Sequence, residues 1–277
     1  MEVERVVGRL DKRTMKRYLL VCCLLLTILL YLLCRANRRR YSREPTAGPR
    51  VIHLIYLPWD KNQKLKVDPE DFDHSYYHSL RKKFTTWQIE MWTLPRLAKL
   101  CSDSYPGVFE QAMSRASRPT MLVDLFRWIV VHKYGGVYVQ YESVLKEDPA
   151  WLLPPVGRQV RLLTEVVLTP EQCAEAAVKY PVRQGRHEEP VRVMNQIFSA
   201  SVPNHPFIGT VWETILRNLS RPIRSDYEVL YASANARVST LFDEVGKRDN
   251  SVFLTNWDDS KSLVKVSSKG SWRTDRA

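Results

Sequence analysis

The sequence predicts one α/β layered domain that follows an N-terminal membrane anchor. Three observations lead to this prediction. From residue 51 onward, apolar β-branched runs typical of strands alternate with segments whose apolar residues recur at helical spacing. The chain contains no internal repeat, no heptad pattern and no low-complexity tract. An uncharged apolar run, Tyr18–Cys34, precedes the domain.

The uncharged run is long enough to cross a thin bilayer, because as a helix it would rise about 26 Å. It lacks the polar face that a core helix keeps, and the basic stretch after it is a poor signal-peptide cleavage site. We therefore expect a tail at 1–17, a single transmembrane signal anchor at 18–34, a basic linker at 35–49 and the domain at 50–277. Basic residues are equally numerous on both sides of the anchor, so the charge rule leaves its orientation open.

The formal net charge of +12 is concentrated near the N-terminus. Residues 1–43 hold eleven basic and three acidic side chains, whereas the rest of the chain holds 31 basic and 27 acidic ones. A nucleic-acid binder would carry basic clusters interleaved with aromatic residues throughout its folded part. This sequence shows no such stripe, so we expect a membrane but no nucleic acid among its partners.

The elements of the domain follow from local patterns in chain order. Val51–Leu57 is an apolar run stopped by Pro58, typical of a buried strand. The clearest helix is Thr120–Lys133, which a glycine pair ends. Other helices are expected near 74–84, 94–101, 106–116 and 207–219, and other strands near 86–92, 137–141 and 161–168.

The end of the clearest helix carries polar residues in a suggestive pattern. Asp124 and Arg127 are three residues apart, so they share one helical face. Gly135 and Gly136 lack a Cβ and could let the backbone approach a ligand. Each part also has an ordinary explanation, since such a charged pair is usually a surface ion pair and such glycines usually cap a helix.

The residues after the glycines alternate along the next predicted strand. Tyr138, Gln140 and Glu142 would therefore point to one side of it. A carboxylate at the carboxyl end of a strand lies where α/β sheets place their ligands. The sequence predicts a ligand site there.

Four stretches carry a more specific signal because they occur together and in a fixed order. They are Ile52-His53-Leu54-Ile55-Tyr56; Val123-Asp124-Leu125-Phe126-Arg127 through Tyr134-Gly135-Gly136-Val137-Tyr138-Val139-Gln140-Tyr141-Glu142; Asn195–Ala200 followed by Asn204-His205-Pro206-Phe207; and Gly270-Ser271-Trp272. In this order they resemble glycosyltransferase family thirty-two. That family has a DXD sugar-binding region and includes α-1,6-mannosyltransferases and inositol-phosphoceramide mannosyltransferases.

The resemblance implies a GT-A fold, a Rossmann-like mixed sheet flanked by helices. It implies transfer of a hexose, with retention, from GDP-mannose or a UDP-hexose to a glycan or glycolipid. It also implies a lumenal body on a type II anchor in the Golgi or endoplasmic reticulum. By resemblance, Glu142 and Gln140 are catalytic, and Glu142 is the main ligand of Mn²⁺. The other implied residues are His53, Asp124, Arg127, Gly135, Gly136 and Tyr138 as donor contacts, and Asn195, His205 and Trp272 as donor or acceptor contacts.

The family's D-x-D reads Gln140-Tyr141-Glu142 here. One negative charge is lost, which weakens the expected cation site. Two alternatives follow: a working transferase with a weak or dispensable metal, or a non-catalytic relative that binds donors or partner glycosyltransferases.

Single residues also have ordinary alternatives. His53 could be a satisfied core histidine, and Asn195 could cap a helix. His205 could mark the entry to a helix, and Trp272 could anchor the C-terminus.

Overall fold

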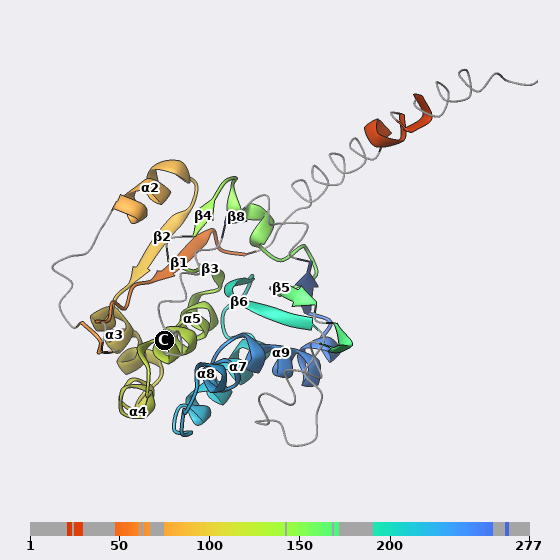
Figure 1. Cartoon of the computed structure of the whole chain (residues 1–277). Coiled ribbons are helices and arrows are strands. Elements are labelled where there is room, and N and C mark those ends of the chain that lie inside the picture. The colour runs from red at the N-terminus through yellow and green to blue at the C-terminus, as the bar shows by residue number, and fades with distance from the viewer. Residues whose placement is uncertain are drawn as a thin grey trace, which may run out of the picture. The chain divides into compact units, whose positions relative to one another are not determined.

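A six-stranded mixed sheet forms the centre of residues Pro45–Ala277 (Figure 1). Its order is β2 (Gln88–Trp92), β1 (Val51–Ile55), β3 (Gly136–Val139), β6 (Val191–Ala200), β5 (Val160–Val167) and β7 (Val252–Thr255). β6 is antiparallel to both of its neighbours, and the other pairs are parallel. The computed structural model describes residues 21–23, 25–29, 48–60, 62, 64–66, 75–141, 143–167, 169–171, 191–256 and 264–265.

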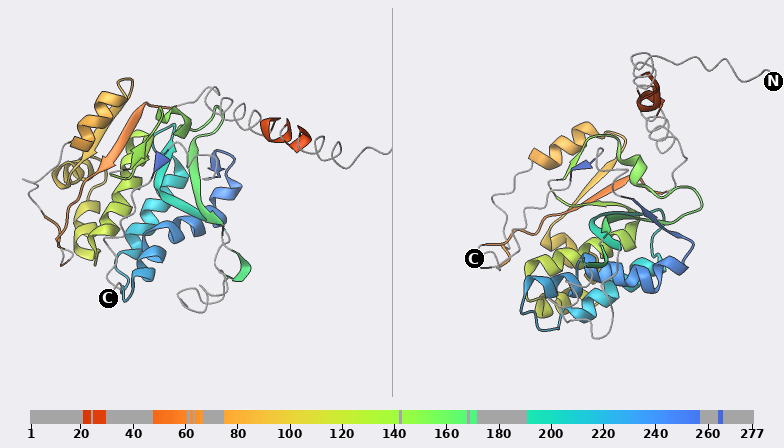
Figure 2. Two further views of the ribbon diagram at one scale, coloured as in Figure 1. Left: turned by 45° about the horizontal axis from the view of Figure 1, so that its top comes forward. Right: turned by 45° about the vertical axis from the view of Figure 1, so that its right-hand side comes forward.

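Helices cover one face of this sheet, and the other face has a thinner cover (Figure 2). These helices pack against the first face: α3 (Leu94–Ser104), α4 (Val108–Arg115), α5 (Pro119–Tyr134), α7 (Pro206–Asn218), α8 (Asp226–Ala232) and α9 (Asn235–Glu244). The opposite face packs α2 (Ser75–Lys83), the 3₁₀ turn η1 (Pro149–Leu152) and the short antiparallel pair β4 (Val144–Leu145) and β8 (Val264–Lys265). A further 3₁₀ turn, η2 (Gly246–Arg248), follows α9. The central strands are buried on both sides, which explains their continuous apolar runs.

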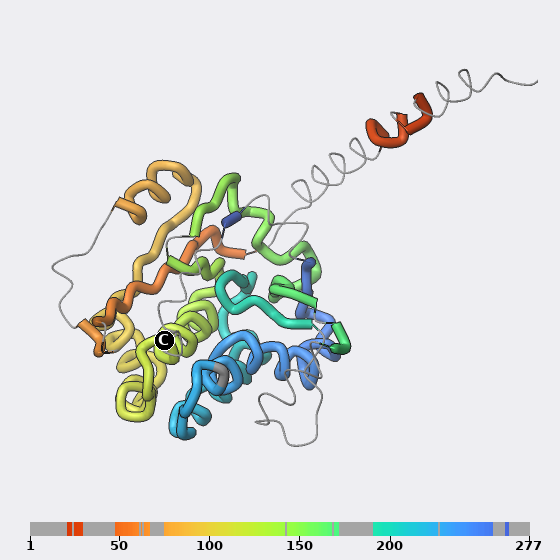
Figure 3. Tube along the Cα trace, viewed as in Figure 1, coloured from red at the N-terminus to blue at the C-terminus, as the bar shows by residue number. Residues whose placement is uncertain are grey.

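Helix α5 is the central helix of the helical layer. It begins with Pro119 at its first turn, where a missing N–H costs nothing. It ends at Gly135, whose N–H bonds to the Val131 carbonyl at 2.8 Å with φ 65°, as the sequence predicts. The Trp128 ring stacks on Phe198 of β6 with 3.7 Å between ring centroids. Figure 3 shows α5 and β6, which are far apart in the sequence, side by side.

The predicted helices and strands are present, with ends moved by a few residues. For β3 the moved end matters: the strand stops at Val139, so Gln140 lies beyond it. The expected alternation from Tyr138 through Gln140 therefore does not run along one regular strand. Asn195 lies in β6, so its alternative role as a helix cap is wrong.

Among the described residues, no helix combines the length and the apolar character that a membrane crossing requires. Of the predicted anchor at 18–34, only residues 21–23 and 25–29 are described, and they are helical. The rest of the anchor, the tail at 1–17 and all but the last two residues of the linker at 35–49 lie outside the described residues.

Candidate functional site

The direction in which strands are added to the sheet reverses between β1 and β3. From β1 the chain moves to β2 on one side and then returns to add β3, parallel, on the other side. In open α/β sheets, ligands bind outside the carboxyl ends of the strands where the order reverses in this way. The segments that leave these two ends begin at Tyr56 and at Gln140.

Aromatic side chains join the segments that leave β1 and β3. The rings of Tyr56 and Tyr141 lie 5.1 Å apart, and Tyr76 of α2 meets Tyr141 edge-on at 5.0 Å. The Tyr76 hydroxyl donates to the Ser143 carbonyl at 2.5 Å. The segment after β3 is therefore held against both the β1 end and α2.

The backbone of the segment after β3 forms a turn beside β6. The Gln140 N–H donates to the Gln196 carbonyl at 2.9 Å, and the Ser143 N–H donates to the Gln140 carbonyl at 3.0 Å. Glu142, the predicted metal ligand, lies outside the described residues.

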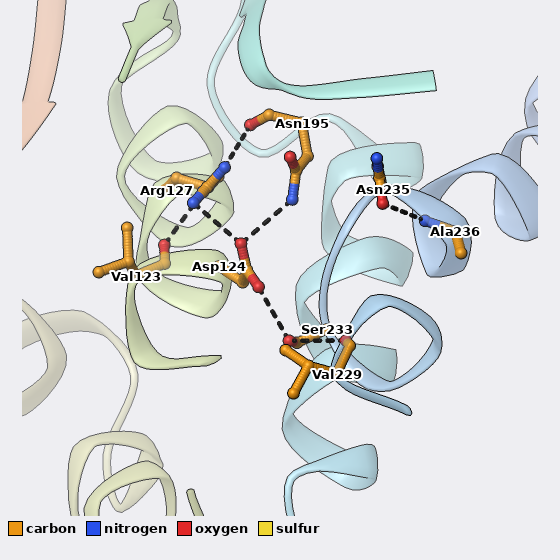
Figure 4. Close-up of polar contacts among 8 residues, drawn as sticks. All are labelled: Val123, Asp124, Arg127, Asn195, Val229, Ser233, Asn235 and Ala236. Carbon is orange, nitrogen blue, oxygen red and sulfur yellow. Dashed lines mark hydrogen bonds and ion pairs between the residues drawn. The ribbon is translucent and has the colours of Figure 1, made fainter. Parts of the chain in front are cut away.

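A buried network of charged and polar side chains lies on the helical face of the sheet (Figure 4). Arg127 Nη2 is 2.9 Å from Asp124 Oδ1, and both side chains are 5% exposed. Asn195 of β6 donates from Nδ2 to the same oxygen at 3.1 Å. The hydroxyl of Ser233, which follows α8, donates to Asp124 Oδ2 at 2.9 Å. One carboxylate thus joins α5, β6 and the end of α8.

Arg127 extends this network to β3. Its Nη1 donates to the Asn195 carbonyl at 2.7 Å, and its Nε donates to the Val123 carbonyl at 3.2 Å. The guanidinium also lies over the Tyr138 ring, 5.1 Å from the centroid. Tyr138 is fully buried, and its hydroxyl has no hydrogen-bond partner within the described part of the chain.

Burial sets the electrostatics of the network. It raises the pKa of the Asp124 carboxyl above its ordinary value, and the Arg127 charge and the hydrogen bonds from Ser233 and Asn195 oppose that rise. Burial also raises the pKa of the Tyr138 phenol. The network brings together four of the predicted site residues and adds Ser233, which the sequence patterns did not identify. It is buried, so the prediction of an ordinary surface ion pair for Asp124 and Arg127 is wrong.

His53 lies away from this network and bonds to the protein through both ring nitrogens. Its Nε2 is 2.8 Å from the Gly135 carbonyl, which can only accept, and its Nδ1 accepts from Trp92 Nε1 at 3.1 Å. The proton of the neutral ring is therefore on Nε2. These contacts match the alternative of a satisfied core histidine.

We expect His53 to make the folded state less stable in acid. Burial lowers the pKa of the His53 ring from 6.5 to about 4, because the charged form would lose its hydration. A second proton on Nδ1 would also face the Trp92 N–H. Since the unfolded chain takes up the proton first, stability is full above pH 6.5 and falls as the pH drops toward 4. The expected loss between pH 7.5 and pH 5 is about 2 kcal/mol.

Chemical denaturation at a series of pH values measures this loss. His53→Asn removes the titrating ring and should flatten the pH dependence over this range relative to the wild type. His132 and His205 remain in both proteins, so their contributions cancel in the comparison. An unchanged pH dependence in the variant would contradict the assignment.

His205 caps the helix α7. Its Nδ1 accepts from the Phe207 N–H at 3.2 Å, and Pro206 occupies the first turn, so the predicted helix entry is confirmed. Its Nε2 lies 2.8 Å from the Ser251 hydroxyl, which in turn bonds Asp249 at 2.5 Å. Because Nδ1 accepts, Nε2 must donate to Ser251, so His205 is not a base for the Ser251 hydroxyl in this arrangement.

The glycine pair fits against protein backbone. An added Cβ at Gly136 would lie 2.6 Å from the Val51 carbonyl oxygen and 3.2 Å from His53 Nε2. An added Cβ at Gly135 would lie 3.1 Å from the Ala200 carbonyl oxygen. The space beside these glycines is therefore occupied by the backbone of β1 and of the end of β6. Trp272, with Gly270 and Ser271, lies outside the described residues.

The described residues do not by themselves supply a set of metal ligands. Within them, no three His, Cys, Asp or Glu side chains gather as a cation site would require. Both Asp124 oxygens are engaged by Arg127, Asn195 and Ser233, and Gln140 offers a neutral carbonyl oxygen. A cation at the predicted position would depend on Glu142 for its charge.

Comparison with solved structures gives distant similarities. No protein-family model and no curated protein matches this chain. A solved chain described as "PaToxG Glycosyltransferase" is 15% identical, with 79% of this chain and 78% of that chain covered and a TM-score of 0.39. Two more, a transferase and a mutant transferase, are 10% and 11% identical, cover 82% of this chain and 94% of theirs, and have TM-scores of 0.34 and 0.32. Similarities at these TM-scores decide neither fold family nor activity.

Proposed function

We propose that the domain is a GT-A-type glycosyltransferase that binds a nucleotide-sugar at the carboxyl ends of β1 and β3. The strand reversal at this place is the observation that carries the proposal. The segments beginning at Tyr56 and Gln140 meet there, and the network of Asp124, Arg127 and Asn195 lies on the helical side of β3 and its neighbour β6. We expect transfer of a hexose to a hydroxyl of a glycan or glycolipid. The first donor to test is GDP-mannose, which would supply mannose.

The chemistry of such a transfer requires positive charge near the departing diphosphate. A bound Mn²⁺ would supply that stabilisation, and Glu142 with the Gln140 carbonyl oxygen are the residues that would hold it. Arg127 is already paired with Asp124, so its role is to fix the geometry of β3 and β6. We further propose that residues 18–34 anchor the protein in the Golgi or endoplasmic reticulum membrane with the domain in the lumen.

Calorimetry tests the proposed binding. The purified full chain is titrated with GDP-mannose, UDP-glucose and UDP-galactose, with and without Mn²⁺. We expect one of these donors to bind, and to bind more tightly with Mn²⁺. Absence of binding to every nucleotide-sugar would contradict the proposed function. Equal binding with and without Mn²⁺ would contradict a role of Mn²⁺ in donor binding.

A second candidate is a non-catalytic subunit that binds a donor or a partner glycosyltransferase. The neutral Gln140 and the internally bonded Asp124 favour it, because neither offers free negative charge to a cation. Binding of a donor without turnover across a panel of glycan and glycolipid acceptors would support this candidate. Turnover would exclude it.

Gln140→Asp should tighten Mn²⁺ binding. The change restores one unit of negative charge beside the proposed ligand Glu142, and we expect about a tenfold or larger gain in affinity. Gln140→Asn is the matched control, because it has the same length as Asp without the charge. Titration of free Mn²⁺ by electron paramagnetic resonance measures both. If Gln140→Asp binds Mn²⁺ no better than Gln140→Asn, the metal has been placed at the wrong residues.

A further inference from the structure

The turn between α8 and α9 sets one serine hydroxyl against Asp124 (Figure 4). Ser233 ends α8 and is fully buried. Its Oγ lies 2.9 Å from Asp124 Oδ2 and 3.3 Å from the Val229 carbonyl oxygen. A serine hydroxyl has one hydrogen to donate, and a carboxylate is the stronger acceptor. The hydrogen therefore goes to Asp124.

Ser233 contacts a different carboxylate oxygen from the other members of the network. Arg127 and Asn195 both bond to Asp124 Oδ1, and the Ser233 hydroxyl bonds to Oδ2. Since the carboxylate is held at both oxygens, it is fixed in rotation about its last side-chain bond. Loss of the hydroxyl would leave Oδ2 buried without this donor, which is costly for a charged group.

Arg127 connects Asp124 to the sheet. The guanidinium bonds to the Asn195 carbonyl of β6 at 2.7 Å and covers the Tyr138 ring of β3 at 5.1 Å. These strands are neighbours, with Tyr138 paired to Phe198. A shift of Arg127 would therefore disturb β3, whose carboxyl end borders the proposed site.

We propose that Ser233 is a positioning residue of the nucleotide-sugar site: its hydroxyl fixes the Asp124 carboxylate against Arg127, and Arg127 fixes the carboxyl end of β3. Ser233 does not touch the donor in this arrangement, because it is fully buried. The inference rests on the proposed function for its effect on donor binding, but its effect on Arg127 can be measured without a donor.

The test compares Ser233→Ala with Ser239→Ala in the full chain. Ser239 is a matched control: it is also buried, and its hydroxyl bonds only to backbone, donating to the Asn235 carbonyl at 2.6 Å and accepting from the Val193 N–H at 2.8 Å. Two readouts are needed: donor affinity by calorimetry below the unfolding temperature of each variant, and solvent exchange of the Arg127 Nε–H by nitrogen-15 NMR.

We expect Ser233→Ala to weaken donor binding about tenfold and to speed the Arg127 Nε–H exchange, with Ser239→Ala changing neither. Ser233→Thr retains the hydroxyl and should restore both values. Equal donor affinity and equal exchange in the two alanine variants would overturn the proposal.

If the wild type binds no nucleotide-sugar, the proposed function fails, and the exchange readout alone decides the role of Ser233. Faster Arg127 exchange in Ser233→Ala only would then still support positioning. Unchanged exchange would overturn it.

Discussion

Gly136→Ala is expected to destabilise the domain strongly. Gly136 has φ 85°, and its added Cβ would lie 2.6 Å from the Val51 carbonyl oxygen. The nearby atoms belong to β1, which pairs with β2 and β3 and cannot retreat without breaking the sheet. The strained backbone and the overpacking together should cost about 3–5 kcal/mol.

Gly157→Ala is the matched control for this loss. Gly157 also has a positive φ, 86°, but no atom lies within 4 Å of its added Cβ. We expect a cost of about 1–2 kcal/mol from the backbone alone. Urea unfolding of both variants separates the two contributions. Equal costs would show that β1 does not confine Gly136.

Arg127→Met is expected to cost about 3–5 kcal/mol of stability, because it leaves the buried Asp124 carboxylate without its counter-charge. The Asn195 carbonyl loses its guanidinium donor in the same variant. Lys99→Met is the control: the Lys99–Asp103 pair has side chains 77% and 56% exposed, and its loss should cost less than about 1 kcal/mol. Urea unfolding measures both.

A double variant separates the charge from the packing. Asp124→Asn removes the carboxylate charge, so adding it to Arg127→Met should cost less than the two single changes summed, by at least about 1 kcal/mol. Asparagine can still accept from Ser233 and keeps nearly the same shape. Additive costs would mean that the two side chains do not act as a pair.

The parts of the fold that local sequence determines were predictable. For helix α5 the apolar spacing, the first-turn proline and the terminal glycine all lie within one short segment of the sequence. β1 is a short apolar run stopped by Pro58, and the central place of such a run follows from its burial on both faces.

Other elements depend on distant partners and were not predicted. β6 carries Asn195 and Gln196 in its middle, so no continuous apolar run or clean alternation marks this strand in the sequence. Asn195 is buried in a strand because Asp124 and Arg127 bond to it. That reason lies about seventy residues away in the sequence.

For α8 a local signal did exist. Ser225 and Glu228 form a capping box, a pattern readable from the sequence as a helix start. It predicts the helix that ends at Ser233, but it does not predict where that helix packs. The contact of Ser233 with Asp124 spans 109 residues and follows from tertiary structure alone.

This spacing has a consequence for synthesis on the ribosome. A chain that has emerged as far as β3 already contains Asp124 and Arg127, but neither Asn195 nor Ser233. The charged pair can be enclosed with all its bonds only after residue 233 has left the exit tunnel. A chain truncated before α8 would therefore keep the Asp124–Arg127 pair but lack the hydroxyl that bonds to Asp124 Oδ2.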